Sequence, residues 1–311
     1  MKTLTNPYQA SDFGRVAVLY GGDSAEREVS LISGQAVLGA LTSAGVQVTG
    51  IDQSAAFIPE LSSGKFDRVF MILHGRGGED GQLQGVLESL AIPYTGSDVL
   101  GSALCMDKYR CKLLWQALSI PTPDFALISS ESDLEHALQS IGFPAFVKPV
   151  HEGSSIGMSP VDNAQQLHEA WVKASHFDSE VLVERRINGP EYTVGLLADD
   201  ILPIIRLEAA RTFYDYEAKY ADETETQYHL PCGLDEQAEK HLGELCQRAF
   251  RAAGGSGWGR VDVLCDEAGQ AYLIDANTAP GMTPHSLIPM AAQSAGLDFQ
   301  SLVLRILGTT L

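Results

Sequence analysis

The chain has 311 residues, and its 21 Lys and Arg against 40 Asp and Glu give a formal net charge of −19. So much negative charge argues against sequence-independent binding to nucleic acid and against docking on an anionic membrane surface, since both depend on Lys and Arg. Hydrophobic residues make up 45% of the chain, which excludes wholesale disorder, and at roughly 150 residues per domain the length predicts two or three domains.

Targeting signals and disulfides are not expected. No window reaches the ~18 consecutive apolar residues of a membrane span, and Met1–Gly14 lacks the apolar stretch of a secretory signal. The five cysteines are an odd number without a C-x-x-C pair, which argues against a disulfide framework and a zinc site. We therefore expect reduced thiols in a cytoplasmic protein.

The first 96 residues alternate between strand and helix patterns after a leader over 1–13 that is expected to be mobile. A capping box from Asp23 to Glu26 is expected to begin the first helix. The expected strands cover 16–20, 46–51 and 69–73, and the expected helices cover about 23–41 and 83–90. This alternation predicts an α/β domain with a parallel sheet over 14–96.

The rest of the chain begins with a long helix expected over 98–117, after the turn-rich Pro93–Gly96. Strands are expected at 125–127, 145–148, 181–184, 192–197, 201–208, 260–266 and 270–277, and helices at about 133–141, 164–175 and 235–253. We place a second boundary near residue 183, and strand patterns dominate from Glu191 onward.

The strongest chemical signal is the last predicted hairpin. Residues two apart on a strand share a face, so Arg260 lies beside Asp262, and Asp275 lies beside Asn277. If the strands pair, two carboxylates and an amide oxygen converge into an oxygen site of the kind that accepts Mg²⁺. The alternative is a pair of solvated acids at a strand edge, and the Pro-Gly turn ending at Gly281 favours the metal site.

A second signal follows the strand that ends in Lys148. The loop over 149–157 is rich in Gly and Ser, which lets backbone N–H groups approach a phosphate, while Lys148 adds positive charge. The lysine precedes the glycines, unlike the P-loop motif, and an ordinary surface loop is the alternative. No G-x-G-x-x-G motif follows the first strand, which weighs against a nicotinamide-dependent dehydrogenase.

Two other segments have both a functional and a structural interpretation. Arg211–Tyr220 is dense in Tyr, Arg and Lys without a clear period, which suits a loop that closes over a ligand or a solvated surface loop. His74 ends a predicted parallel strand, where ligands often bind, or it is a hydrogen-bonded structural residue.

Together, eight segments resemble the D-alanine–D-alanine ligase family of the ATP-grasp superfamily, in the family's order from about residue 15 to 305. They are Gly21-Gly22 with Ser24–Ser30, His74–Gly81, Met106–Lys108, Lys148-Pro149 with Glu152–Gly157, Gly189–Glu191, Tyr214–Tyr220, Gly257–Asp262, and Ala276–Thr283 with His285–Leu287.

The resemblance implies an α/β chain with an N-terminal parallel-sheet domain and an ATP-grasp fold. The implied units are an N-terminal substrate-side domain over 14–96, a central ATP-grasp subdomain over 97–183, and a C-terminal subdomain over 184–311 with the metal site and a closing loop at 211–226. It further implies an ATP-dependent ligase that joins two D-alanines through D-alanyl phosphate, giving D-alanyl-D-alanine, ADP and phosphate for peptidoglycan precursors. Its partners would be D-alanine, ATP and a second copy of the chain, with neither nucleic acid nor membrane.

The resemblance also assigns residues to roles. ATP is expected to contact Lys108, Lys148, Glu184, Arg185, Ile187, Glu191 and Lys219. Two Mg²⁺ (or Mn²⁺) ions are expected on Asp262, Asp275 and Asn277. The two D-alanine sites are expected at Glu26, His74, Ser154, Tyr220, Ser286 and Leu287. Arg260 and the Gly281 N–H are expected to stabilise the oxyanion.

Some positions depart from the family's common pattern. Asp275 stands where glutamate is common and is one methylene shorter, which reduces its reach toward a second metal. Pro160 and Pro284 replace a common lysine and a serine. Tyr220 resembles the enzymes that make the dipeptide rather than the D-lactate ester. The rival hypotheses are another ATP-grasp carboxylate–amine ligase, such as an L-amino acid ligase, and a non-catalytic nucleotide-binding regulator.

Overall fold

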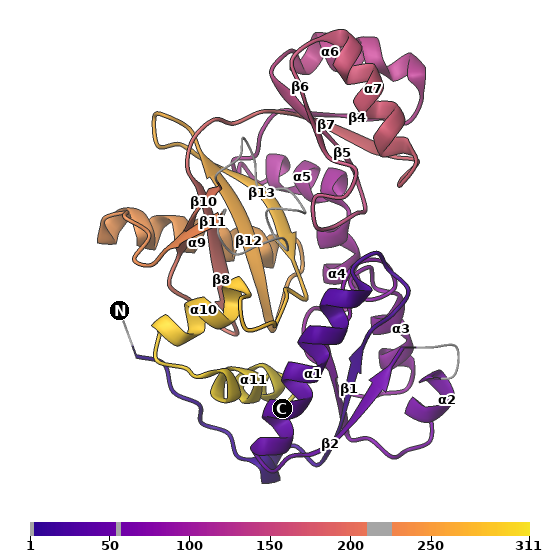
Figure 1. Ribbon diagram of the computed structural model, residues 1–311, viewed down its shortest axis with the longest axis vertical. Coiled ribbons are helices and arrows are strands. Elements are labelled where there is room, and N and C mark those ends of the chain that lie inside the picture. Colours follow the sequence, from indigo (N-terminus) through magenta and orange to yellow (C-terminus); the bar gives the residue numbers. More distant parts are fainter. Residues whose placement is uncertain (1–2, 54–56, 210–225) are drawn as a thin grey trace.

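Three β-sheets organise the part of the chain that the computed structural model describes, residues 3–53, 57–209 and 226–311 (Figure 1). Their strand orders are β2-β1-β3, β4-β7-β5-β6 and β11-β10-β8-β12-β13, with β9 paired to β8. Within these ranges, no helix is both long and apolar enough to cross a membrane. The five cysteines are all buried and unpaired with one another.

The N-terminal sheet is parallel, as predicted, because a helix returns the chain between its strands. Its elements are β1 (Arg15–Tyr20), α1 (Arg27–Ser43), β2 (Gln47–Asp52), α2 (Phe57–Leu61), β3 (Arg68–Met71) and α3 (Gln82–Ser89). The expected Asp23–Glu26 capping box is wrong: Glu26 itself occupies the N-cap, and its side chain does not cap the helix.

The predicted long helix over 98–117 is two helices, α4 (Val99–Met106) and α5 (Lys108–Ala117). Asp107 separates them in an extended conformation, with φ −87° and ψ 92°, and its carboxylate accepts a hydrogen bond from the Arg110 N–H. Aspartate favours such N-caps over helix interiors, because its short side chain satisfies the exposed N–H groups at a helix start.

The central sheet, which is antiparallel, has one face toward helices and the other toward a cavity. Its elements are β4 (Phe125–Ile128), η2 (Glu131–Asp133), α6 (Leu134–Ile141), β5 (Ala145–Pro149), β6 (Ser159–Val161), α7 (Ala164–Ser175) and β7 (Val181–Arg185). Val147 and Val183 face α6 and α7, so the alternation along each strand directs Lys148 and Glu184 to the opposite face.

The C-terminal sheet carries a β-bulge in its last hairpin. Its elements are β8 (Glu191–Leu197), β9 (Asp200–Ile201), β10 (Ile205–Ala209), β11 (Thr226–His229), α9 (Glu236–Ala252), β12 (Trp258–Cys265) and β13 (Ala271–Asn277). Asp262 pairs with Asp275 and Val263 pairs with Leu273, so Ile274 is an extra residue. The bulge lets Leu273 face the core and Asp275 face the cavity, although they are two residues apart.

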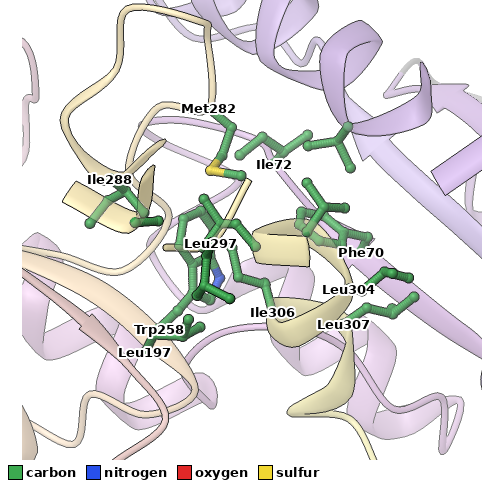
Figure 2. Close-up of a cluster of buried hydrophobic side chains, with 14 of the residues drawn as sticks. Phe70, Ile72, Leu197, Trp258, Met282, Ile288, Leu297, Leu304, Ile306 and Leu307 are labelled. Carbon is green, nitrogen blue, oxygen red and sulfur yellow. The ribbon is translucent and has the colours of Figure 1, made fainter. Parts of the chain in front are cut away.

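Two C-terminal helices that the sequence analysis did not predict, α10 (Leu287–Ser294) and α11 (Phe299–Gly308), join the N-terminal sheet to the C-terminal one. Figure 2 shows their contact with both: Phe70 and Ile72 come from the N-terminal domain, and Leu197 and Trp258 from the C-terminal sheet. A single apolar cluster therefore spans the two domains.

Part of the leader that was expected to be mobile belongs to the same cluster. Leu4 and Phe13 are buried in it, and the Leu4 N–H donates to the Ala295 carbonyl. A short helical turn, η1 (Ala10–Asp12), lies between them. The described part of the leader packs against the shared cluster, because burial of Leu4 and Phe13 removes their apolar surface from water.

The α4–α5 pair also departs from the expected grouping of residues. Cys105, Cys111 and Trp115 pack with α9 against the C-terminal sheet, whereas the central sheet has a core of its own. The predicted boundaries near residues 96 and 183 stay predictions.

Replacing Ile306 with Ala tests the shared cluster. Ile306 is fully buried there, so the lost burial and the resulting cavity should lower the free energy of unfolding by about 2–5 kcal/mol. Urea denaturation measures the change. Leu311→Ala is the matched control, because Leu311 is 63% exposed and its loss should cost no more than about 0.5 kcal/mol. Equal effects of the two variants would contradict the assignment.

Candidate active site

A cavity of about 750 Å³ receives side chains from both large sheets and from the N-terminal domain. Most of the residues singled out from the sequence line it. They are Glu26, His74, Lys108, Lys148, Ser154, Glu184, Glu191, Arg260, Asp262, Asp275, Asn277, Gly281, Ser286 and Leu287. Segments far apart in the sequence therefore meet at one place.

Arg185 and Ile187 do not line the cavity. The Arg185 Nε lies 3.2 Å from Asp124, its guanidinium lies 5.1 Å from the Tyr272 ring centre, and Ile187 is buried. Their expected contacts with adenine run mainly through backbone groups and stay a prediction. Lys219, Tyr220 and nearly all of the expected closing loop lie outside the described residues.

The acidic hairpin has the register that the metal hypothesis needs. Arg260 pairs with Asn277, and Asp262 pairs with Asp275, so the four side chains share the cavity face. Asp262 accepts hydrogen bonds of 2.9 Å from both Arg260 Nε and Nη2, and one of 3.2 Å from Asn277 Nδ2. Thr193 donates another at 2.7 Å.

This donor set fits a hard divalent cation. Two carboxylates and one carboxamide provide the oxygen ligands that Mg²⁺ accepts. Neighbouring carboxylates repel each other, and positive groups offset that repulsion here: Arg260 contacts Asp262, and the Lys108 Nζ lies 3.8 Å from the Asp275 carboxylate. The hairpin can therefore carry these negative charges before a cation arrives.

Two lysines reach the cavity from separate elements. Lys108 begins α5, and its Nζ donates to the Glu152 carbonyl at 2.7 Å. Lys148 lies on β5, with its Nζ 2.5 Å from Glu184 Oε1. Both side chains are nearly buried, so their positive charges act in a medium that screens them less than water does.

The Gly/Ser loop packs on the start of α1. Ser154 donates a short hydrogen bond to Glu26, and a side chain at Gly153 would come within 2.7 Å of the Glu26 carboxylate. Ser154 and Ser155 have φ of +49° and +59°, a left-handed conformation that non-glycine residues seldom adopt. This contact brings a loop of the central sheet onto the N-terminal domain.

His74 makes the contacts that the structural interpretation expects, and its ring also lines the cavity. Its Nδ1 lies 2.8 Å from the Ala279 carbonyl, so that nitrogen carries the proton. Burial lowers the pKa of His74, which favours a neutral ring.

Glu79 was not predicted from the sequence. Its carboxylate accepts hydrogen bonds from the Gly75 and Ala279 N–H groups, which ties the segment after β3 to the segment after β13. Burial, followed by the negative charge of Glu26, raises the pKa of Glu79 to about 8. The sequence offered one indication of a role for Glu79: it lies in the segment from His74 to Gly81, which resembles the family.

Gly281 and Ser286 form a tight turn before α10. A side chain at Gly281 would lie 2.9 Å from the Ser286 Oγ, so it would displace that hydroxyl. Ser286 is the N-cap of α10 and accepts a hydrogen bond from the Thr283 N–H. The positive end of α10 therefore borders the cavity, where it favours an anion such as a carboxylate.

His151 links the Gly/Ser loop to the start of α5. Its Nδ1 lies 2.8 Å from Asp178 and its Nε2 lies 3.2 Å from Asp107. Hydrogen bonds to Asp107 and then Asp178 raise the pKa of His151 to about 9. Asp107, His151 and Glu180 have ligand atoms within 4.8 Å of one another, but Arg110 is paired with both carboxylates, so this cluster is an ion-pair network.

The raised pKa of His151 predicts a pH-dependent contribution to stability. The stabilisation should be fully present below pH ~6.5, the value for an unfolded histidine, and should be lost as the pH rises through about 9. The free energy of unfolding of the wild type minus that of His151→Gln, measured in urea from about pH 6 to about pH 10, reports this contribution. His136→Gln is the control because His136 is exposed. A pH-independent difference for His151→Gln would contradict the prediction.

Comparison with known proteins identifies relatives of nearly full length. Residues 55–97 match the family described as D-ala D-ala ligase N-terminus, and residues 114–308 match D-ala D-ala ligase C-terminus. A D-alanine–D-alanine ligase of Pseudomonas putida (strain GB-1) is 59% identical over 95% of this chain and 92% of its own length. One from Stutzerimonas stutzeri (strain A1501) is 55% identical over 100% and 99%.

Solved structures agree with these relatives. The D-alanine–D-alanine ligase from Bacillus anthracis is 33% identical with a TM-score of 0.86, covering 96% of this chain and 97% of its own. The same enzyme complexed with ATP gives 31% identity and a TM-score of 0.84 over the same shares. The VanG D-Ala:D-Ser ligase from Enterococcus faecalis gives 30% and 0.83, covering 96% of this chain and all of its own.

Proposed function

The chain belongs to the D-alanine–D-alanine ligase family, and we propose that it is an ATP-dependent ligase that joins two D-alanines at the cavity described above. The products are D-alanyl-D-alanine, ADP and phosphate, and the dipeptide serves peptidoglycan synthesis. The observation that carries the site assignment is the paired register of Asp262 with Asp275 and of Arg260 with Asn277, facing two lysines of other elements.

ATP lies between the central and C-terminal sheets in this proposal. Lys108 and Lys148 hold its phosphates, Glu191 holds the ribose, and Lys219 contacts the γ-phosphate. Adenine rests against Glu184, Arg185 and Ile187, chiefly through backbone groups. Asp262, Asp275 and Asn277 would hold Mg²⁺ (or Mn²⁺), which when bound would neutralise charge that develops on the phosphates. The shorter Asp275 leaves one and two ions as alternatives.

The first D-alanine binds near the start of α1. Glu26 pairs with its ammonium group, and Ser154 and Tyr220 connect this site to the closing loop. The carboxylate of D-alanine attacks the γ-phosphorus of ATP, ADP leaves, and the acyl phosphate retains a good leaving group. Because water would hydrolyse this acyl phosphate, the closing loop has to exclude it.

The second D-alanine binds at the start of α10, where Ser286 and the Leu287 N–H receive its carboxylate. Its amine attacks the acyl carbon, phosphate leaves, and the amine loses a proton. Arg260 and the Gly281 N–H stabilise the oxyanion, and the contact of Arg260 with Asp262 fixes the guanidinium in advance. The neutral His74 ring completes the wall beside the substrates.

The family resemblance carries two further proposals. The enzyme acts in the cytoplasm on small molecules, and it functions as a homodimer. Neither depends on the chemistry of the cavity.

A phosphate-release assay tests the proposed reaction. With ATP and Mg²⁺, phosphate should be released when D-alanine is present and only weakly with L-alanine. The reason is that Glu26, Ser154 and Arg260 are expected to bind one enantiomer of the substrate. Mass spectrometry of the products with D-alanine, D-serine and D-lactate identifies the second substrate. Equal phosphate release with L-alanine would reject the assignment, and D-alanyl-D-serine as the main product would reject the second substrate.

Replacing Lys148 with Ala tests the phosphate contact. The loss of one positive charge at the nucleotide should raise the dissociation constant of ATP by about tenfold or more, measured by calorimetry without D-alanine. Lys173→Ala is the matched control, since Lys173 is an exposed lysine of the same unit that contacts Ser159. An unchanged affinity in Lys148→Ala would show that phosphates bind elsewhere.

A further inference from the structure

We propose that Lys112, which does not line the cavity, is a positioning residue for the nucleotide. It pairs with the Glu184 carboxylate on the side away from the cavity, so that Lys148, on the cavity side, remains available to the phosphates. This inference rests on the proposed ATP-dependent function and adds a residue that the family motifs did not indicate.

Lys112 follows Lys108 by one turn of α5, so the two side chains lie on the same side of the helix. Lys108 lines the cavity, whereas Lys112 is fully buried beneath it. The Lys112 Nζ lies 3.0 Å from Glu184 Oε2 and donates to Thr122 Oγ1 at 2.7 Å. A longer hydrogen bond of 3.3 Å reaches the Leu273 carbonyl.

Glu184 lies between two lysines. Phe146 is its register partner on β5, so Lys148, two residues further along, shares its face and is its diagonal neighbour. Lys148 contacts Oε1 from the cavity side, and Lys112 contacts Oε2 from the buried side. Burial would raise the pKa of Glu184, but the attraction of Lys112 and Lys148 outweighs it and lowers the pKa to about 2.

The charges of this group explain why a second lysine matters. The charges of Lys148 and Glu184 alone sum to zero. To bind Lys148, a phosphate would have to replace the buried Glu184 carboxylate as its partner. A buried charge that loses its partner is strongly destabilised. Burial lowers the pKa of Lys112, and the attraction of Glu184 opposes that shift. With a charged Lys112 the three groups carry a net charge of +1, and Glu184 keeps a partner when Lys148 turns toward a phosphate.

Lys112 also connects both walls of the nucleotide site. Glu184 belongs to β7 of the central sheet, while Leu273 belongs to β13, two residues before Asp275. Thr122 donates to the same Leu273 carbonyl at 2.9 Å. The ammonium group is therefore held at a fixed place between the two sheets, and the position of Glu184 follows from it.

Calorimetry with Lys112→Met tests the proposal. Methionine keeps most of the length of the side chain and removes the charge, so the dissociation constant of ADP should rise about tenfold, as expected for one lost charge acting over several ångströms. The dissociation constant of adenosine, which has no phosphate, should not change. Lys240→Met is the matched control: Lys240 is 75% exposed, and its loss should leave both constants unchanged.

A second variant separates this role from a general loss of structure. Lys112→Met/Glu184→Gln removes the buried pair together, which leaves Lys148 without a competing carboxylate. Its ratio of ADP to adenosine dissociation constants should return to the wild-type ratio or fall below it. Because Lys112 and Glu184 are removed together, neither is left as the unpaired half of the buried pair, and the remaining charge, on Lys148, faces the cavity. The variant therefore also serves if Lys112→Met alone does not fold.

Three results would overturn the proposal: unchanged ADP affinity in Lys112→Met, equal weakening of ADP and adenosine, or a double variant that stays as weak as the single one. The proposed reaction is judged separately. If wild-type protein binds ADP but releases no phosphate from ATP with D-alanine, the proposed ligase function is rejected. The ratio of the ADP and adenosine dissociation constants still tests the role of Lys112 in that case.

Discussion

Carboxylates withdrawn from water need a positive group or an N–H donor beside each of them, and this constraint shapes the cavity. Asp262 meets Arg260, and Asp275 meets Lys108. A chain with a net charge of −19 therefore gathers several of its few cations at one place. In the proposed function the same groups meet phosphates and cations, so the charges that permit folding would also prepare the site for an anionic nucleotide.

The alternation of side chains along strands places most of the site residues on the cavity face, and one β-bulge changes the alternation where it would fail. The period of two separates the core side of β5 and β7 from the cavity side, which places Lys148 and Glu184 together. On β13 the same rule alone would put Leu273 and Asp275 on one face. The bulge at Ile274 resolves this conflict between a core residue and a site residue. Without the extra residue, Leu273 and Asp275 could not face the core and the cavity respectively.

The sequence predicted the regular strands and the hairpin that holds Arg260 and Asp262, because alternation and motif order are local. It did not predict the break at Asp107, since a helix pattern continues through that residue and only the capping of Arg110 by its side chain interrupts it. Burial of Leu4 and packing of α11 depend on partners hundreds of residues away. Lys112 was missed for a similar reason: in the sequence it is one more polar residue of a helix.

The three units of the fold are joined by contacts of different kinds. The N-terminal and C-terminal units share the apolar cluster of Figure 2, whose separation would expose large side chains such as Phe70 and Trp258 to water. The core of the central sheet draws on its own residues within 126–183, and its loop meets the N-terminal unit through polar pairs such as Ser154 with Glu26 and Arg76 with Glu152. Water can replace polar pairs at little cost, whereas it cannot replace apolar contact. Opening of the cavity is therefore least costly where the central sheet meets the rest. In the proposed function, a ligand that pairs with Lys148 on one side and with the Asp262 hairpin on the other adds contacts across that same boundary.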